Sequence, residues 1–442
     1  MKRTSIRALV CAISVAMVIT ACGSDGGGGT ADTVDTPIDT TGSADTTSTE
    51  KTVPTPTTVP TPTSEPTATT ESKGPASGEP LKIMQIVLDS PDLGLTFPEA
   101  QAAVKGRIQR LNEDGGIAGR PVEVEVCQAG FDPNAANECA QKAVDGDYIA
   151  VVSSNIASGG DYHDVLSVAG IPEIGYAGYV PKDGENPLGF MVSAGAQGSV
   201  MAAANRVARE FSPDTVAVMH TDSPGGVQSL TDASSVLESL GIEVSPVPIP
   251  RNQPDLSAQV QTAMGADAVL NFSTGVDLAK TLGGLVQAGY QQQIVVSAGV
   301  IPALAAALGP ALDGLKSVTP WATPNMNTEG YEQHLADIAS VDESIVSTAL
   351  GVEAWAGADL FARAAAIAAS GDSAALIAAL ATITDYDAGG AATPMDFSEP
   401  GSVIAGQPAI RRNTAVDCTF QAGVCLADTG EWYNARTGEP VD

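Results

Sequence analysis

Small polar side chains recur directly after apolar runs that predict buried β-strands. In an open sheet of parallel strands, ligands bind at the carboxyl ends of the strands, where helix N-termini present free backbone N–H groups. Hydroxyl and N–H groups at these ends suit an anionic group such as a carboxylate. A helix N-cap is the alternative role for each hydroxyl. The candidate ligand-binding residues are Ser153, Ser154, Asn155, Tyr176, Ala177, Thr221, Asp222, Thr274 and Ser297.

The sequence offers little for acid–base or nucleophilic catalysis. Its three histidines are His163, His220 and His334. It contains no H-E-x-x-H zinc motif, no G-x-S-x-G nucleophile elbow and no G-x-x-x-x-G-K-[ST] phosphate loop. His220 ends a strand-like run, where sites often lie, but no nucleophile is identifiable beside it. We therefore expect no enzyme, no cofactor and no metal, with a surface hydrolase as an alternative.

Four cysteines lie in the body of the chain. Cys127, Cys139, Cys418 and Cys425 allow three pairings. The bridges 127–139 and 418–425 are favoured because each closes a short loop. A four-cysteine zinc site is the alternative, although neither pair has the two-to-four-residue spacing that such sites use. Structural disulfides would agree with an exported protein.

The N-terminus has the pattern of a secretory signal. Basic residues precede an apolar run from residue 8 to residue 21, which is shorter than the roughly 20 residues that a spanning helix needs. Val18-Ile19-Thr20-Ala21 before Cys22 resembles the lipobox of bacterial lipoproteins. That resemblance implies removal of residues 1–21 and a diacylglyceryl group on Cys22, so the protein would be lipid-anchored to the outer face of the cell membrane. An ordinary signal peptide with an incidental cysteine is the alternative.

Residues 22–80 read as the lipidated cysteine followed by a linker. Thr makes up 17 of the 43 residues from 30 to 72, and no aromatic residue appears before Phe97. Such a segment buries too little apolar surface to offset its ordering entropy. Residues 1–80 hold 9 acidic and 5 basic residues, so residues 81–442 carry −27 of the net charge of −31. A body this acidic is repelled by phosphate backbones, which excludes nucleic acid as a partner.

From residue 81 onward, short apolar runs alternate with longer amphipathic segments. This alternation predicts an α/β fold with mainly parallel, doubly wound sheets that helices cover on both faces. About 362 residues suit two such domains. Strands are expected near 83–88, 122–126, 148–152, 215–219, 267–272 and 294–297, and helices near 98–112, 134–145, 198–211, 227–240 and 277–288.

One segment carries a family resemblance. Residues 111–122, Leu-Asn-Glu-Asp-Gly-Gly-Ile-Ala-Gly-Arg-Pro-Val, resemble the I-N-x-x-G-G-I-x-G-R-x-V stretch of leucine/isoleucine/valine-binding ABC-transporter substrate-binding proteins. Residues 189–192 followed by Gln197 look like that family's crossover into a second lobe. The resemblance implies a type I periplasmic-binding-protein fold, with two lobes joined by a three-strand hinge and closing on a ligand. Residues 81–197 and 320–385 would form lobe 1, and residues 198–319 and 386–442 would form lobe 2.

The resemblance also bears on the ligand. Members that bind amino acids use a Ser in the first loop, matched by Ser153 or Ser154, and the acid that would meet an α-ammonium group falls at Asp277. An acid in the first turn of a helix is the alternative reading of Asp277. Two departures, Tyr176-Ala177-Gly178 without a hydroxyl pair and Pro224-Gly225 in place of a Tyr, argue against carrying over branched-chain specificity.

Together these features predict a monomeric, lipid-anchored solute-binding protein. It would capture a small polar, amino-acid-like ligand and deliver it to ABC permease subunits. A lipoprotein that senses its ligand and presents the bound state to a receptor is the alternative.

Overall fold

The computed structural model describes most of the chain from Gly74 onward. The predictions for the signal peptide 1–21, for Cys22 and for the linker as far as residue 73 lie outside the described residues, as does Thr274. The described residues belong to a compact unit that extends from Thr70 to Asp442. They are residues 74–91, 95–157, 159–251, 253–273, 275–290, 293–297 and 308–441.

Within these ranges, the first sheet has five parallel strands in the order β2-β1-β3-β4-β5. Ile83 and Met84 are neighbours on β1 and both are fully buried, yet they lie in different hydrophobic clusters. Successive side chains of a strand point to opposite faces, so both faces of this sheet are covered. The strands are β1 (Leu81–Val87), β2 (Val122–Gln128), β3 (Ala150–Val152), β4 (Glu173–Ile174) and β5 (Gly189–Phe190).

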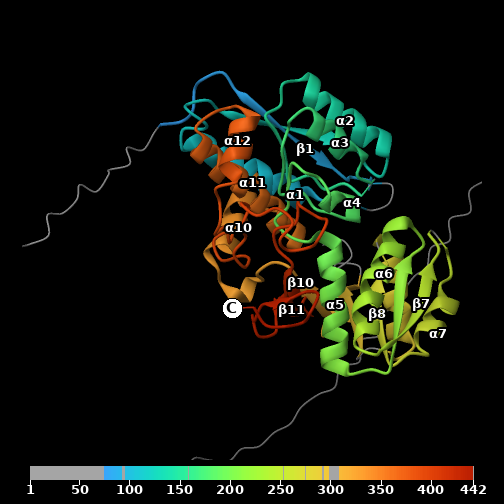
Figure 1. The fold of residues 1–442 in the computed structure, drawn as a ribbon. Helices are drawn as coiled ribbons and strands as arrows, with labels where there is room; N and C mark the ends of the chain where they lie inside the picture. The colour runs from blue at the N-terminus through green and yellow to red at the C-terminus, as the bar shows by residue number, and fades with distance from the viewer. Residues whose placement is uncertain are drawn as a thin grey trace, which may run out of the picture. The chain divides into compact units, whose positions relative to one another are not determined.

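Helices α1 and α11 cover one face of this sheet, and α2 and α3 cover the other (Figure 1). Helix α1 approaches α10 closely at Gly106, where a Cβ would lie 2.0 Å from the carbonyl oxygen of Asp337. Glycine therefore permits the two helix backbones to pack directly. The helices of this first lobe are α1 (Pro98–Glu113), α2 (Pro133–Asp145), α3 (Asp161–Val168), α4 (Pro181–Gly184), α10 (Glu329–Val341), α11 (Ala349–Ala368) and α12 (Ser373–Leu380).

The second sheet, counted over the same ranges, has eight strands. Seven follow the order β12-β11-β10-β9-β8-β6-β7, and β13 pairs with β11. Strands β6 to β10 are parallel, whereas β11 runs antiparallel to β10 and β12. The strands are β6 (Thr215–Thr221), β7 (Glu243–Ile249), β8 (Ala268–Phe272), β9 (Ile294–Ser297), β10 (Lys316–Thr319), β11 (Thr414–Gln421), β12 (Val424–Ala427) and β13 (Tyr433–Asn434).

Helices cover both faces of this sheet as well. Val218 and Met219 of β6 lie in separate clusters, the first with α5 and α6 and the second with α7 and α8. The predicted α/β class with mainly parallel sheets is therefore confirmed, and each predicted strand and helix range is present to within three residues. The remaining elements are α5 (Gly195–Phe211), α6 (Pro224–Ser239), α7 (Ser257–Ala263), α8 (Gly275–Gln287), and the 3-10 turns η2 (Gly309–Leu312) and η3 (Pro324–Met326).

The described chain passes between the two sheets at residues 191–195, 320–323 and 409–413. The first and third of these crossovers run side by side, because Met191 forms a parallel bridge with Ile410 and donates its N–H to Ala409 at 2.9 Å. The family resemblance predicts that everything after residue 385 belongs to the second lobe. Tyr386, Met395 and Phe397 instead pack in the same hydrophobic cluster as Ile83 of β1. The chain therefore stays in the first lobe until the third crossover.

Both disulfides favoured by their short loops are formed. Cys127–Cys139 joins β2 to α2, and Cys418–Cys425 joins the antiparallel strands β11 and β12. The four cysteines thus lie in two separate pairs, and the described residues contain no cluster of His, Cys, Asp and Glu that could hold a metal. No single described helix is long and apolar enough to cross a membrane. Helices α11 and α12 meet the length and composition test only as a pair bent by 104°.

Candidate ligand-binding site

The loop after β3 is held firmly by the rest of the first lobe. Ser153 is 2% exposed, has a φ of +52°, and donates its hydroxyl to the carbonyl oxygen of Ala354 in α11 at 2.7 Å. Ser154 is 1% exposed, and its hydroxyl oxygen accepts the N–H of Ile86 at 3.3 Å. The two hydroxyls predicted to meet a ligand therefore already have backbone partners, and they fix the course of the loop.

Asn155 is the residue of this loop with a buried side-chain atom that has no hydrogen-bond partner among the described residues. Its backbone N–H donates to Ile86 at 2.9 Å, and it bridges Val87 on one side and Ala177 on the other. Its Oδ1 accepts the hydroxyl of Tyr179, whereas its Nδ2 has no partner among the described residues. The residue is 2% exposed, so this amide is a buried donor at the carboxyl end of β3. A buried donor without a partner is costly unless an acceptor arrives.

Tyr179 lies beside the candidate site, and sequence reasoning did not identify it. Burial raises the pKa of its phenol, and the nearby carboxylates of Glu353 and Asp183 raise the pKa further. The phenol therefore stays protonated and donates to Asn155, which orients the side-chain amide so that Nδ2 is left over. The available signal was a tyrosine two residues beyond Ala177, in the loop after β4.

The two residues predicted in that loop have other roles. Tyr176 is fully buried in a cluster with Met191 and Ile410, and its hydroxyl donates to the carbonyl oxygen of Asp183. Ala177 donates its N–H to the carbonyl oxygen of Ser154 at 2.9 Å, and this bond joins the loops after β3 and β4. The structure thus brings the first-lobe candidates together at one edge of the sheet, with Asn155 and Tyr179 as the hydrogen-bonding pair.

The second-lobe candidates lie at the carboxyl ends of β6, β8 and β9. Thr221 is buried, and Asp222 is exposed with its N–H donated to Ile249 at 2.9 Å. Asp277 lies in the first turn of α8, 6% exposed, with a carboxylate oxygen 3.3 Å from Nζ of Lys280. Its charge is favourable at a helix N-terminus and already has a cation beside it. Ser297 ends β9, opposite Val318, and its side chain lies outside the described structure.

Sequence reasoning also missed a set of buried polar residues at the crossovers. Arg412, on the third crossover, is 3% exposed and stacks its guanidinium 4.5 Å from the ring of Trp321 on the second. Glu353 of α11 accepts the hydroxyl of Ser193, on the first crossover, at 2.6 Å. Burial raises the pKa of Glu353, and the hydrogen bond from Ser193 and the charge of Arg412 offset part of that rise.

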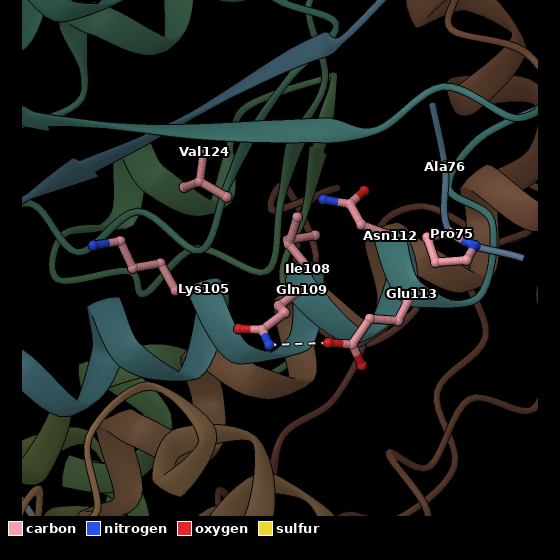
Figure 2. A pocket seen from close by; sticks show the side chains of 8 residues that line it. All are labelled: Pro75, Ala76, Lys105, Ile108, Gln109, Asn112, Glu113 and Val124. Carbon is pink, nitrogen blue, oxygen red and sulfur yellow. Dashed lines mark hydrogen bonds between the residues drawn. The ribbon is translucent and has the colours of Figure 1, made fainter. Parts of the chain in front are cut away.

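A pocket of about 350 Å³ lies elsewhere, where the segment before β1 meets α1 and β2 (Figure 2). Gln109 donates to Glu113 within it at 3.0 Å. None of the predicted ligand-binding residues lines this pocket, so it is separate from the candidate site. Its lining residues are Pro75, Ala76, Lys105, Ile108, Gln109, Asn112, Glu113 and Val124.

Solved structures of binding proteins share this fold. A substrate-binding periplasmic protein from Ralstonia solanacearum superposes with a TM-score of 0.68 at 18% identity, over 79% of this chain and 100% of that chain. A fatty acid ABC transporter substrate-binding protein from Thermomonospora curvata gives 0.67 at 18% identity, over 83% and 95%. A leucine binding protein from Thermotoga maritima gives 0.66 at 16% identity, over 80% and 99%. At these identities the likeness establishes the fold.

No curated protein matches the sequence. The family model described as "periplasmic binding protein" matches residues 80–409, which is most of the chain and includes strands of both sheets. The chain therefore belongs to the periplasmic binding protein family, whose members are extracytoplasmic solute-binding proteins and not enzymes.

Proposed function

We propose that this protein is an extracytoplasmic lipoprotein that captures a small polar, amino-acid-like ligand and delivers it to the permease subunits of an ABC importer. The observation that carries the ligand class is the free Nδ2 donor of Asn155, fixed by Tyr179 at the carboxyl end of β3. An amide donor there suits the carboxylate or carbonyl group of such a ligand. Family membership and the named neighbours, a leucine binding protein among them, support the transport role.

The second lobe supplies the remaining predicted contacts. Thr221 and Ser297 end strands β6 and β9, and Asp222 and Thr274 follow strands in the sequence. Asp277 would face the ammonium group of an amino acid in place of Lys280. A ligand that contacts both lobes stabilises the closed state in proportion to its extra contacts there. Residues 191–195, 320–323 and 409–413 are the segments that such a closure would bend.

The anchor follows from the N-terminal sequence. Cys22 would carry the diacylglyceryl group, and the residues from 23 to 73 would hold the body off the outer face of the membrane. The last residues of the predicted linker instead bind the body, because Ala76 donates its N–H to the carbonyl oxygen of Asn112 at 2.9 Å. Cys22→Ser should move the protein from the membrane fraction to the soluble fraction and leave its ligand binding unchanged. Cys11→Ser is the matched control, because Cys11 lies within the segment expected to be removed. A wild-type protein that already fractionates as soluble would contradict the anchor.

Ligand binding is tested by thermal shift with the twenty L-amino acids, their amides, and fatty acids of increasing length. We expect an amino acid or a related small polar acid to raise the melting temperature and to make the protein more compact in X-ray scattering. Asn155→Ala should abolish the shift, while Asn134→Ala, an exposed asparagine on α2, should retain it. A shift with fatty acids alone would overturn the ligand class, and no response to the whole panel would overturn capture of any ligand in it.

A further inference from the structure

A buried ionic cluster lies beneath the loop that carries Tyr179, and nothing in the proposed ligand contacts uses it. It consists of His163 of α3, Glu173 of β4 and Asp183 of α4, which are 2%, 0% and 3% exposed. The imidazole Nδ1 lies 2.5 Å from a carboxylate oxygen of Glu173, and Nε2 lies 3.2 Å from a carboxylate oxygen of Asp183. One ring thus bridges two carboxylates that the sequence separates by ten residues.

The geometry favours a protonated imidazole, although the Asn186 amide also lies 3.3 Å from Nδ1. A neutral imidazole has one N–H and could donate to one carboxylate, whereas here both ring nitrogens face an acceptor. Burial by itself lowers the pKa of His163, but Glu173 and Asp183 outweigh it and raise the pKa to about 9. His163 is therefore a buried cation at neutral pH.

The other groups around the cluster are neutral or lie further off. Tyr162 donates its hydroxyl to Glu173 at 3.1 Å, and Asn186 donates Nδ2 to the same carboxylate at 3.2 Å. Tyr176 donates to the backbone carbonyl of Asp183. Arg411, on the third crossover, lies near enough for its charge to offset part of the raised pKa of Tyr176. Among the described residues, it forms no hydrogen bond with Glu173 or Asp183. In this part of the chain, His163 is the cation that is bonded to both acids.

Asp183 connects this cluster to the candidate site. Its second carboxylate oxygen accepts the backbone N–H of Tyr179 at 2.6 Å and that of Val180 at 3.0 Å. Tyr179 in turn donates its hydroxyl to Asn155. A continuous line of hydrogen bonds therefore runs from the imidazole through Asp183 and Tyr179 to the free amide of Asn155.

We propose that His163 is a positioning residue for the ligand site: its positive charge holds Asp183 where it fixes the Tyr179 loop. Loss of that charge leaves two buried carboxylates beside an uncharged side chain, which favours movement of Asp183 or uptake of a proton by it. Either change weakens the acceptor for the Tyr179 and Val180 amides. The consequence for ligand affinity rests on the proposed function, whereas the coupling within the loop does not.

The test measures hydrogen–deuterium exchange of these two amides in the ligand-free protein, with protection factors corrected for intrinsic exchange. Between pH 7.5 and pH 10, protection at Tyr179 and Val180 should fall at least about tenfold, the effect of losing one charge-assisted hydrogen bond. The fall should track the titration of the His163 ring in NMR spectra, which contain signals of only three histidines. A protection profile without this alkaline step would overturn the proposal.

Two variants sharpen the assignment. His163→Gln should lower protection at both amides at pH 7.5 and remove the alkaline step. His334→Gln is the control, because His334 is equally buried, in α10, and its pKa is lowered to about 4 by burial, so it is neutral throughout this range. A folded His163→Gln with wild-type protection would contradict the proposal; if that variant does not fold, the wild-type profile alone decides. A failed ligand panel would contradict the proposed function and leave this result standing.

Discussion

Arg412 donates its Nε–H to the carbonyl oxygen of Val192 across 3.2 Å, and so ties the third crossover to the first. The same guanidinium donates Nη1 to Pro320 on the second crossover at 2.5 Å. One buried side chain thus connects the three described segments that pass between the sheets. Because Arg presents its donors in a rigid fork, it can meet two backbone carbonyls at once, which a lysine ammonium on a flexible stem does less well.

We expect Arg412→Lys to lower the free energy of unfolding by about 2 kcal/mol, because the charge is kept while the fork and the stacking on Trp321 are lost. Urea unfolding followed by circular dichroism measures the change. Arg363→Lys is the matched control. Arg363 is 43% exposed and paired with Asp385 at 2.7 Å, so its replacement should cost less than about 0.5 kcal/mol. Equal losses in the two variants would show that Arg412 does not connect the crossovers.

The stability of the protein should fall on both sides of a maximum near pH 6.5, because two buried histidines have opposite shifts. The pKa of His163 is raised to about 9 in the fold against about 6.5 in the unfolded chain. Its contribution is therefore complete below pH 6.5 and is lost as the pH rises toward 9. The pKa of His334 is lowered to about 4, mainly by burial, so its contribution is complete above pH 6.5 and is lost as the pH falls toward 4.

On each side of the maximum, the acid limb and the alkaline limb of the profile, the free energy of unfolding should fall by on the order of 3 kcal/mol. This is the free energy that corresponds to pKa shifts of this size. Urea unfolding from pH 4.5 to pH 9.5 measures both limbs. His163→Gln should flatten the alkaline limb and His334→Gln the acid limb. Because carboxylates also titrate below pH 5, the comparison with His334→Gln is what assigns the acid limb. A wild-type profile that stays flat from pH 6.5 to pH 9 would contradict the raised pKa of His163.

The two disulfides should contribute unequally. Loop-closure entropy gives roughly 3 kcal/mol for Cys127–Cys139, with a separation of 12 residues, and roughly 2 kcal/mol for Cys418–Cys425, with a separation of 7. Urea unfolding of the two double-alanine variants measures these costs. Wild-type protein reduced with dithiothreitol controls for the side-chain volume that alanine removes. If reduction leaves the unfolding midpoint unchanged, the bridges do not stabilise the fold.

Local sequence patterns predicted the fold because the devices that build it are local. Gly116 has a φ of +62°, and a Cβ there would lie 2.1 Å from the carbonyl oxygen of Arg120. The segment 111–122, which carries the family resemblance, therefore needs glycine at this turn. Arg120 donates to the carbonyl oxygens of Glu79 and Pro80, which secures the segment leading into β1. The Gly116 turn closes within a few residues, so the residue order reveals it, whereas the bonds from Arg120 reach back 40 and 41 residues to the segment before β1.

The site was harder to predict because its hydrogen bonds join distant segments. Ser153 was expected to offer its hydroxyl to a ligand, yet the acceptor is Ala354, 201 residues further on. Asn155 is a residue that the sequence predicts for the site, but its partner Tyr179 is not, because only the folded sheet brings the two loops together. A polar residue directly after a strand thus predicts which edge of the sheet carries the candidate site. It does not predict which of its atoms is left without a hydrogen-bond partner.

The contact between Ser153 and α11 depends on a close approach of two glycines. A Cβ on Gly357 would lie 2.5 Å from Oγ of Ser153 and 2.7 Å from Cα of Gly175, so Gly357→Ala must displace the loops after β3 and β4. We expect it to cost about 2 kcal/mol of unfolding free energy, the usual effect of an overpacked core. Gly283→Ala is the control in α8, where an added Cβ meets nothing within 4 Å, and it should stabilise by about 0.5 kcal/mol. Urea unfolding separates the two signs, and a neutral Gly357→Ala would show that the loop is less tightly packed than the structure indicates.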